Sequence, residues 1–235
     1  MISKGQVVVS QTDLIGWFAD INSFFATRPD LAEVFEDPRR VFNYDETAME
    51  LGVSTQKVLA PVSKKQVYTV SSSTRDHVTL GVTVNAAGNM VPPRAVFAGK
   101  HNLATTKVNL PENGRSGVWQ FSYTVNGWVD RKSMVAFIQD IGDFLAREDI
   151  PRPVLLFMDG AKCHLSLEIA QLCTKLNVQP ILLCPNMTHL TQPLNLTYFQ
   201  SFKAELQKEK EAWHHQNVGI SFEQICNHTP SIQSH

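Results

Sequence analysis

The sequence lacks the features that identify several large classes of protein. No apolar run approaches the roughly 20 residues that a membrane-spanning helix needs. The N-terminus has no basic stretch followed by an apolar one, as a secretory signal does, and repeats and low-complexity tracts are absent. We therefore expect a soluble intracellular protein without membrane contact.

Cysteine is scarce, and its placement excludes two further classes. The four cysteines form no C-x-x-C pair and no disulfide-framework spacing; they are Cys163, Cys173, Cys184 and Cys226. No second pair at ligand spacing accompanies Cys163 and His164, so a zinc site is not predicted. We expect reduced thiols, three of them in the densest apolar region.

Charge is low and nearly balanced. The 21 Lys and Arg against 22 Asp and Glu give a net charge of −1, so any contact with nucleic acid would come from a local basic patch. The chain is 43% hydrophobic and 18% charged, which suits a buried core. Its 235 residues suit one large domain with or without appended segments.

The apolar pattern divides the chain into three parts. An apolar stripe over residues 13–25 predicts a helix, and we interpret residues 1–40 as a helical lead-in or linker. Residues 41–214 form the predicted main domain. Residues 215–235 are polar, and we expect a poorly ordered tail.

Within the main domain, strands precede an alternation of helices and strands. The expected strands are Val41–Tyr44, Gln66–Val70, a hairpin of Val78–Val84 and Val91–Phe97, Val154–Met158, and Pro180–Leu183. The expected helices are Asp130–Leu145, Leu165–Leu176, and Leu194–His214 after Pro193. This order predicts an α/β fold with a mixed central sheet and flanking helices.

Two aspartates stand where apolar runs end, Asp45 after Val41–Tyr44 and Asp159 after Val154–Met158. Aspartate has a low strand propensity, and α/β sheets bind ligands at the carboxyl ends of their strands. A paired-carboxylate site is one interpretation. The alternative is that each aspartate forms a turn, as Asp-Gly at 159–160 commonly does.

The third informative segment ends on Asn195, after thirty-five residues that intervene from Asp159. Over residues 40–205 the chain resembles the DDE-type transposase domain of the pogo branch of the mariner superfamily, which includes Tigger and jerky elements and centromere protein B. The matching motifs are Asn43-x-Asp45-Glu46-Thr47, Leu155-Leu-x-x-Asp159-Gly160 with His164, and Pro185-Asn186-x-Thr188-His189-x-x-Gln192-Pro193-Leu194.

The resemblance implies a ribonuclease H-like fold and a two-metal site. Asp45 and Asp159 would be the metal ligands for Mg²⁺ or Mn²⁺, and position 195 would supply the third acid of the catalytic set. No small-molecule cofactor is implied. His164 and His189 flank the site as second-shell candidates that orient phosphate or water; the alternative is that they hydrogen-bond loops beside the sheet.

Asparagine at 195 departs from the family pattern. Its carbonyl oxygen preserves one donor but removes a negative charge, and a unit charge pair at about 4 Å is worth about 4 kcal/mol at an effective dielectric near 20. Glu46 adjoins Asp45 but would point to the opposite face of the strand. We therefore expect impaired cleavage.

DNA is the partner that the resemblance implies, with a homodimer or other protein partners also open and a nuclear location expected. Candidate phosphate contacts are Lys57, Lys64, Lys65 and Lys203, with Arg75, Lys100 and Lys107 as further basic residues. Singly, each is typical of solvated surface. Family members usually carry helix-turn-helix domains upstream, and residues 1–40 are too short for two of them.

Three functions compete. The first is an active metal-dependent endonuclease or transposase. The second is a catalytically inactive domesticated domain that binds DNA or protein, which Asn195 favours over the first. The third is an unrelated α/β enzyme with Asp159 as nucleophile or base, and the Gln192-Pro193-Leu194 motif argues against it because such a site needs nothing there.

Overall fold

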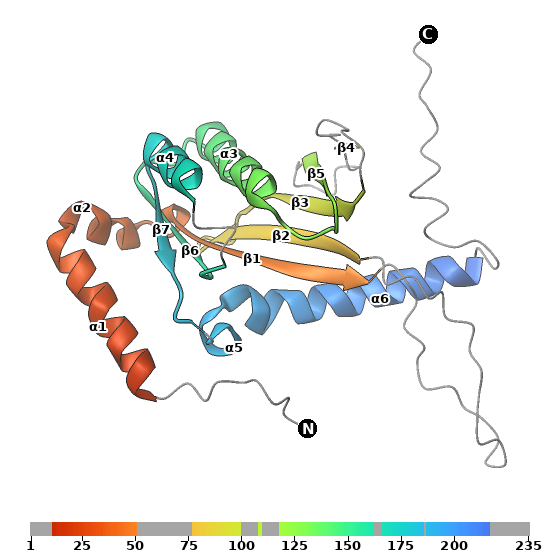
Figure 1. Cartoon of the computed structure of the whole chain (residues 1–235), viewed down its shortest axis with the longest axis horizontal. Coiled ribbons are helices and arrows are strands. Elements are labelled where there is room, and N and C mark those ends of the chain that lie inside the picture. Colours follow the sequence, from red (N-terminus) through yellow and green to blue (C-terminus); the bar gives the residue numbers. More distant parts are fainter. Residues whose placement is uncertain are drawn as a thin grey trace, which may run out of the picture.

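A seven-stranded mixed sheet forms the centre of the molecule. The computed structural model describes residues 11–50, 77–99, 108–109, 118–161, 166–185 and 187–216. The strand order is β4-β5-β3-β2-β1-β6-β7, and helices cover both faces (Figure 1). The strands are β1 (Val41–Glu50), β2 (His77–Asn85), β3 (Met90–Ala98), β4 (Val108–Asn109), β5 (Val118–Thr124), β6 (Val154–Met158) and β7 (Val178–Leu182).

The central strand β1 joins an antiparallel half of the sheet to a parallel half. It pairs with β2 antiparallel from Phe42 to Glu50, and with β6 parallel only from Val41 to Asn43. β2 and β3 form an antiparallel hairpin, β6 and β7 are parallel, and β5 runs parallel to β3. The mixed pairing expected from the order of elements is confirmed.

The helices are α1 (Gln11–Thr27), α2 (Pro29–Ala32), α3 (Arg131–Arg147), α4 (Leu167–Leu176), α5 (Thr188–Thr191) and α6 (Phe199–Gln216). Short 3-10 segments cover Glu33–Glu36 and Pro38–Arg40, and a π-helical segment, Leu194–Tyr198, leads into α6. In Figure 1, α3 and α4 lie on one face of the sheet, and α5 and α6 lie on the other.

The face under α3 and α4 holds the larger core cluster. Phe42 and Tyr44 of β1 pack against Phe144 and Phe137 of α3 in edge-on contacts. Gly81 in β2 allows this packing, because a Cβ atom there would lie 2.0 Å from the Phe137 ring. Any side chain at 81 would displace the Phe137 ring from its place against β2.

Two clusters cover the opposite face. Leu194 and Phe199 pack on the buried side chains of β2 and β3. Leu31 and Val34, from α2 and the segment after it, pack on Leu155 of β6. The helical residues that precede the sheet therefore contribute to its core.

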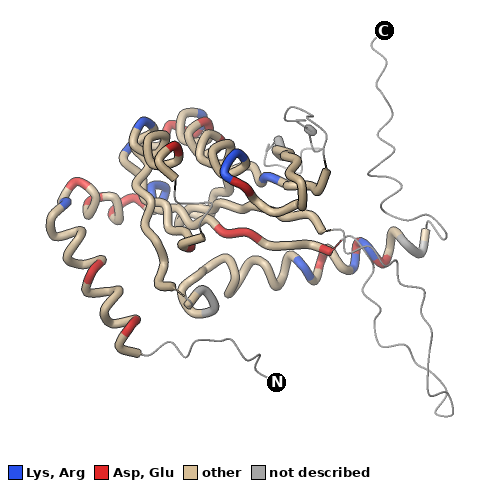
Figure 2. The backbone as a smooth tube through the Cα atoms, viewed as in Figure 1, with Lys and Arg blue, Asp and Glu red and all other residues tan. Residues whose placement is uncertain are grey.

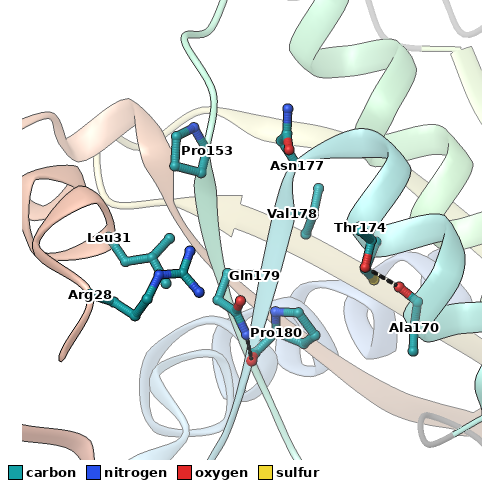
Figure 3. Close-up of a pocket in the computed structure, with 10 residues that line it drawn as sticks. Arg28, Leu31, Pro153, Ala170, Thr174, Asn177, Val178, Gln179 and Pro180 are labelled. Atoms are coloured by element: carbon teal, nitrogen blue, oxygen red, sulfur yellow. Dashed lines mark hydrogen bonds between the residues drawn. The ribbon is translucent and has the colours of Figure 1, made fainter. Parts of the chain in front are cut away.

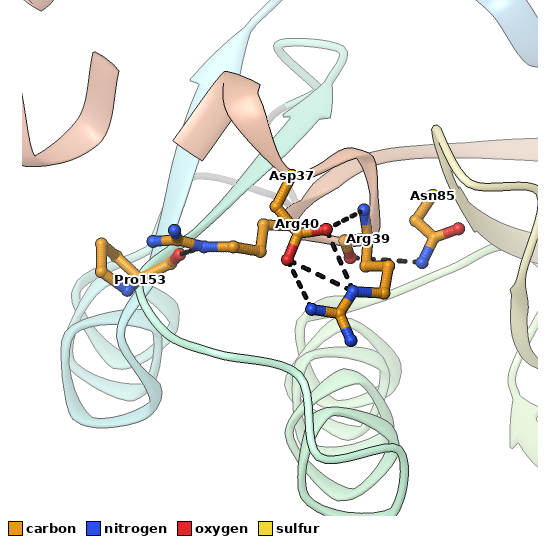
Figure 4. A network of polar contacts seen from close by, with 5 residues as sticks. All are labelled: Asp37, Arg39, Arg40, Asn85 and Pro153. Carbon is orange, nitrogen blue, oxygen red and sulfur yellow. Dashed lines mark hydrogen bonds and ion pairs between the residues drawn. The ribbon is translucent and has the colours of Figure 1, made fainter. Parts of the chain in front are cut away.

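A polar network holds the start of β1 against both neighbouring strands (Figure 4). The Asp37 carboxylate accepts hydrogen bonds from the backbone N–H (3.0 Å) and the guanidinium (2.7 Å) of Arg39. Arg40 Nε donates to the carbonyl of Pro153, just before β6, at 3.0 Å. Asn85 Nδ2, at the end of β2, donates to the carbonyl of Arg39 at 3.2 Å. These bonds set the register from which the site is built.

Most predicted elements of the main domain are present within two residues of their expected bounds. The exception that matters is the first strand. We predicted a strand that ends at Tyr44 with Asp45 after it, but β1 continues to Glu50. The low strand propensity of aspartate is overridden because every residue from Phe42 to Glu50 pairs with β2.

Several expectations fall outside the described residues: the strand Gln66–Val70, Cys163, Cys226, and the tail beyond Gln216. The domain boundary at residue 41 stays a prediction. Cys173 and Cys184 are free and buried, as expected of core thiols, and burial raises the pKa of Cys173 to about 11. Among the residues that the structure describes, no helix is long and apolar enough to cross a membrane.

Candidate metal centre

The parallel register of β1 and β6 brings Asp45 and Asp159 together. Asn43 pairs with Phe157, so two residues further along each chain Asp45 comes level with Asp159, directly after β6 ends at Met158. The two carboxylates interact, since the charge of Asp159 contributes to raising the pKa of Asp45. The acids meet where the pairing between β1 and β6 stops, although only Asp159 follows the end of its strand.

Asp45 is a buried acid with one unsatisfied oxygen. Its side chain is 8% exposed, and burial raises its pKa from 3.8 to about 6, with hydrogen bonds from the Glu46 backbone and the Gln192 side chain opposing this shift. Oδ2 of Asp45 has no hydrogen-bond partner among the described residues. A buried carboxylate in this state destabilises the fold unless a proton or a cation neutralises it.

Asn43 and Gln192, which we call the amide pair, connect the three elements around Asp45. Gln192 is fully buried; its Nε2 donates to the carbonyl of Tyr44 at 3.0 Å, and its Oε1 accepts a hydrogen bond from Asn43 Nδ2. Asn43 Nδ2 also donates to the carbonyl of Phe157 at 3.1 Å. Asn43 Oδ1 accepts from the backbone N–H of Leu194 at 3.4 Å.

These contacts set the place of Asn195. Leu194 is buried and tied to Asn43, and Asn195 follows it on the same side of the sheet as the amide pair. The backbone N–H of Asn195 donates to the carbonyl of Gln192 at 3.2 Å, and Asn195 itself is exposed. Asn195 is therefore the second residue of the helical segment that begins at Leu194, whose backbone bonds Asn43, two residues before Asp45.

Glu46 does not substitute for the missing acid. The Tyr44 hydroxyl donates to Glu46 Oε1 at 2.7 Å, and Tyr44 packs against Phe137 of α3. Glu46 thus lies on the α3 side of the sheet, opposite Asp45, as the alternation of strand side chains predicted.

The other residues predicted for the site form two groups, those outside the described part of the chain and those within it. His164, Lys57, Lys64 and Lys65 lie outside the described residues, as do Arg75, Lys100 and Lys107. His189 belongs to α5, which precedes the amide pair's Gln192 in the chain. Lys203 is exposed on α6 and lines a hollow of about 270 Å³ beside Ala48, Met49 and Glu50 at the end of β1. The roles of all these residues stay predictions.

The donor atoms suit a divalent metal ion with hard, oxygen-preferring chemistry. Two carboxylates and one amide oxygen are ligands that Mg²⁺ and Mn²⁺ accept, and the orphaned Oδ2 of Asp45 is a buried donor without a partner within the described part of the chain. Within that part no cluster of three His, Cys, Asp or Glu side chains is arranged to hold a metal. The residues present fit a metal site with two acids rather than three.

Two larger cavities lie away from the carboxylates. A polar one of about 380 Å³ lies at the amino-terminal ends of β6 and β7, between Arg28, Thr174 and Gln179 (Figure 3). An apolar one of about 520 Å³ lies between α1 and the turn before Leu194, with Trp17 and Phe18 in its wall. Neither is lined by Asp45 or Asp159, so neither is the candidate site.

The amide pair is the part of the site to which the sequence assigned no role. Both residues belong to motifs that were recognised, yet their partnership is not visible because they are 149 positions apart in the chain. One signal was available for Asn43: it precedes Asp45 by two residues, so a strand places both side chains on one face. No comparable signal exists for Gln192.

Sequence comparison identifies a family and one distant relative. Residues 75–222 match the family described as DDE superfamily endonuclease; Asp159 and Asn195 fall within this range, and Asp45 precedes it. The chain is 29% identical over 182 residues to the MFS-type transporter clz9 of Cochliobolus lunatus, a match covering 75% of this chain and 19% of that protein. The chain spans about a fifth of that relative's length.

Structural comparison finds the fold in a transposase. The Mos1 transposase paired-end complex with left transposon end superposes with a TM-score of 0.55 at 11% identity, over 94% of this chain and 60% of that chain. The catalytic domain of Mos1 mariner transposase gives 0.51 at 10% identity, over 90% and 83%. The Mos1 mariner paired end complex with Mn gives 0.55 at 10% identity, over 94% and 60%. These likenesses establish the ribonuclease H-like fold.

The family match covers more than half of the chain, and the sheet order, the paired aspartates and the helix that begins beside them agree with it. The chain belongs to the DDE superfamily of endonucleases, as a transposase-derived domain with a ribonuclease H-like fold.

Proposed function

We propose that this domain acts on or binds DNA, and that its Asp45 and Asp159 hold Mg²⁺ or Mn²⁺ too weakly for efficient cleavage because the third position is Asn195. The observation that carries the proposal is that Asp45 on β1 and Asp159 just after β6 each lie two residues beyond the last β1–β6 pair, close enough for their charges to interact, with Oδ2 of Asp45 buried and unsatisfied among the described residues. We also propose that the chain belongs to the pogo branch of the superfamily, which the motifs around Asp45, Asp159 and Asn195 support.

A divalent ion supplies two things to such a site: activation of a water or 3′-hydroxyl, and stabilisation of the leaving oxygen. The chain's own residues determine how much of this is available. Asp45 carries the buried, desolvated charge that a cation neutralises, and Asp159 adds a second charge from the half-buried end of β6. Asn195 contributes a dipole in place of a charge, which lowers the affinity for a second ion.

The relatives indicate the substrate and the metal. The Mos1 complexes that share this fold contain a transposon end in one case and Mn in another, which supports DNA as the substrate of this domain and Mn²⁺ as one of its metals. We also propose that the domain resides in the nucleus and forms homodimers or binds protein partners. Imaging of a tagged chain and light scattering test these two points.

The nicking of supercoiled plasmid in Mg²⁺ and in Mn²⁺ tests the function directly. We expect weak or absent nicking by the wild type, nicking restored by Asn195→Asp, and none by Asp159→Ala. Because Asn195 is exposed, the aspartate adds charge without disturbing the core. Nicking by the wild type that survives Asp159→Ala would contradict the proposal.

A second candidate function is a domain that binds DNA or protein without cleavage. Asn195 is the observation that favours it. If Asn195→Asp nicks and the wild type does not, the scaffold is competent and the natural chain acts as a binding module.

A further inference from the structure

We infer that Gln192 is a positioning residue for the metal centre: its side-chain amide orients Asp45 and ties the helix that carries Asn195 to the strand that carries Asp45. This inference rests on the proposed metal-binding function and adds to it a residue that touches neither metal nor DNA.

Burial and complete hydrogen bonding distinguish Gln192 from an ordinary glutamine. It is 0% exposed, and it is the only buried glutamine in the described part of the chain. Glutamine is rarely buried in proteins unless its donors and acceptor are satisfied. Here the donor nitrogen bonds the Tyr44 carbonyl and the acceptor oxygen bonds Asn43.

The positions of these bonds flank Asp45 on its own strand. Tyr44 immediately precedes Asp45, and Asn43 lies two residues before it on the same face of β1. The Gln192 side chain also acts on the Asp45 carboxylate, lowering its pKa against the effect of burial. Oδ2 of Asp45 is buried and has no hydrogen-bond partner among the described residues, so one oxygen is available to a cation.

Asn43 extends the same network to the other two elements of the site. Its Nδ2 bonds the carbonyl of Phe157, two residues before Asp159, and its Oδ1 bonds the backbone of Leu194, one residue before Asn195. The hydrogen bonds of the amide pair therefore reach a residue one or two positions before each of Asp45, Asp159 and Asn195. A shift of Gln192 moves the positions relative to one another without removing any ligand.

Outer residues of this kind tune metal affinity. Loss of a hydrogen-bonding partner behind a metal ligand typically weakens binding about 10–100-fold. Gln192→Met keeps the length of the side chain and removes both hydrogen-bonding functions. We expect Mn²⁺ affinity to fall by about that factor in the wild type and in an Asn195→Asp background.

Binding of Mn²⁺, followed by electron paramagnetic resonance well below each variant's melting temperature, tests this. Gln179→Met is the matched control, because Gln179 is a half-buried glutamine on β7 whose amide, among the described residues, bonds the adjacent Pro180 carbonyl and nothing near the metal centre. We expect its affinity to stay within twofold of the parent. Melting is recorded separately by circular dichroism, since a purely structural role would lower the melting temperature and leave the affinity of the folded protein unchanged.

The outcomes separate the two proposals. If neither the wild type nor Asn195→Asp binds Mn²⁺, the proposed metal centre is wrong and this inference fails with it. If the parents bind and Gln192→Met binds within twofold of them, the metal centre stands and the inference alone is overturned.

A measurement on the wild type covers the case in which Gln192→Met does not fold. A titration with Mg²⁺ is followed by nuclear magnetic resonance of glutamine side-chain amides. We expect the Gln192 amide, identified by its slow hydrogen exchange, to shift and saturate together with the backbone amide of Asp45. Saturation of Asp45 with no change at Gln192 would overturn the inference.

Discussion

Two buried charged groups on the same sheet have opposite surroundings. Arg94 on β3 is 3% exposed and is fully engaged: Nε and Nη2 lie 2.8 and 2.7 Å from Asp140 Oδ2 of α3, and Nη1 donates to Ser122 Oγ at 2.8 Å. Asp45 on β1 is nearly as buried, yet the charges that act on it are those of the acids Asp159 and Glu46, and Oδ2 is unsatisfied among the described residues.

The difference distinguishes a buried charge that serves the structure from one that serves a function. A buried charge that is paired and hydrogen-bonded is tolerated by the fold and helps to specify it. A buried charge without a partner is destabilising and persists where a ligand supplies the partner. In Figure 2, acidic residues lie along β1, whereas basic and acidic residues alternate along α6.

Removing one partner of the satisfied pair should give the largest effect on stability. Arg94→Met leaves the largely buried Asp140 carboxylate of α3 without its cation, and we expect a loss of about 3–5 kcal/mol in the free energy of unfolding. Urea denaturation measures it.

The double variant Arg94→Met with Asp140→Leu is the control, because it removes both charges. It should recover most of the loss. A single variant that loses less than about 1 kcal/mol would show that this pair behaves like an exposed one, and the comparison with Asp45 would break.

Asp45→Asn should change the free energy of unfolding in the opposite direction and stabilise the fold. The folded pKa of Asp45, about 6, lies above the 3.8 of the free side chain, so the folded state holds the proton more tightly than the unfolded state. The stability that protonation provides is present below about pH 4 and is lost as pH rises to about 6. We expect Asp45→Asn, which stays neutral, to be more stable than the wild type above pH 6 by on the order of 2–3 kcal/mol.

Urea denaturation of both proteins between pH 4 and pH 8, without divalent metal, checks this. The difference should be small near pH 4, grow to pH 6 and then level off. Added Mn²⁺ should stabilise the wild type and leave Asp45→Asn unchanged. A wild type that is the more stable protein at pH 8 without metal would contradict the assignment of Asp45 as an unpartnered charge.

The sequence predicts those features of the sheet and the site that depend on local sequence pattern. The strand Val154–Met158, the helix of Asp130–Leu145 and the acid at 159 follow from apolar periodicity and motif. Asp45 was identified as a site residue for the same reason. Its place in mid-strand was missed, because pairing with β2 extends β1 where the propensity of aspartate predicts an end.

The partners of the buried polar groups were not predictable. Arg94 and Asp140 are 46 positions apart, and Asn43 and Gln192 are 149 apart. Gln192 belongs to a recognised motif, but nothing in its neighbours Thr191 and Pro193 indicates that its side chain is buried or which residues it bonds. Such contacts depend on how distant elements pack, and only the folded structure brings their side chains together.

The smallest expected effect lies on the surface, where charge is neither buried nor needed for the fold. Lys203 is exposed on α6, eight residues after Asn195, and no acid pairs with it in the described chain. Lys208, five residues on, is also exposed but bonds Glu205 at 2.7 Å.

If DNA follows the helix away from the metal centre, Lys203→Ala should weaken binding several-fold at low salt and reduce the slope of log affinity against log salt by about 1. Fluorescence anisotropy with labelled duplex DNA between about 50 and 200 mM NaCl measures this, with Lys208→Ala as the matched control. Both substitutions lower the net charge of the protein by the same amount, but only Lys203 is proposed to contact a phosphate. Equal losses of affinity in the two variants would therefore show a general charge effect and would remove Lys203 from the proposed DNA path.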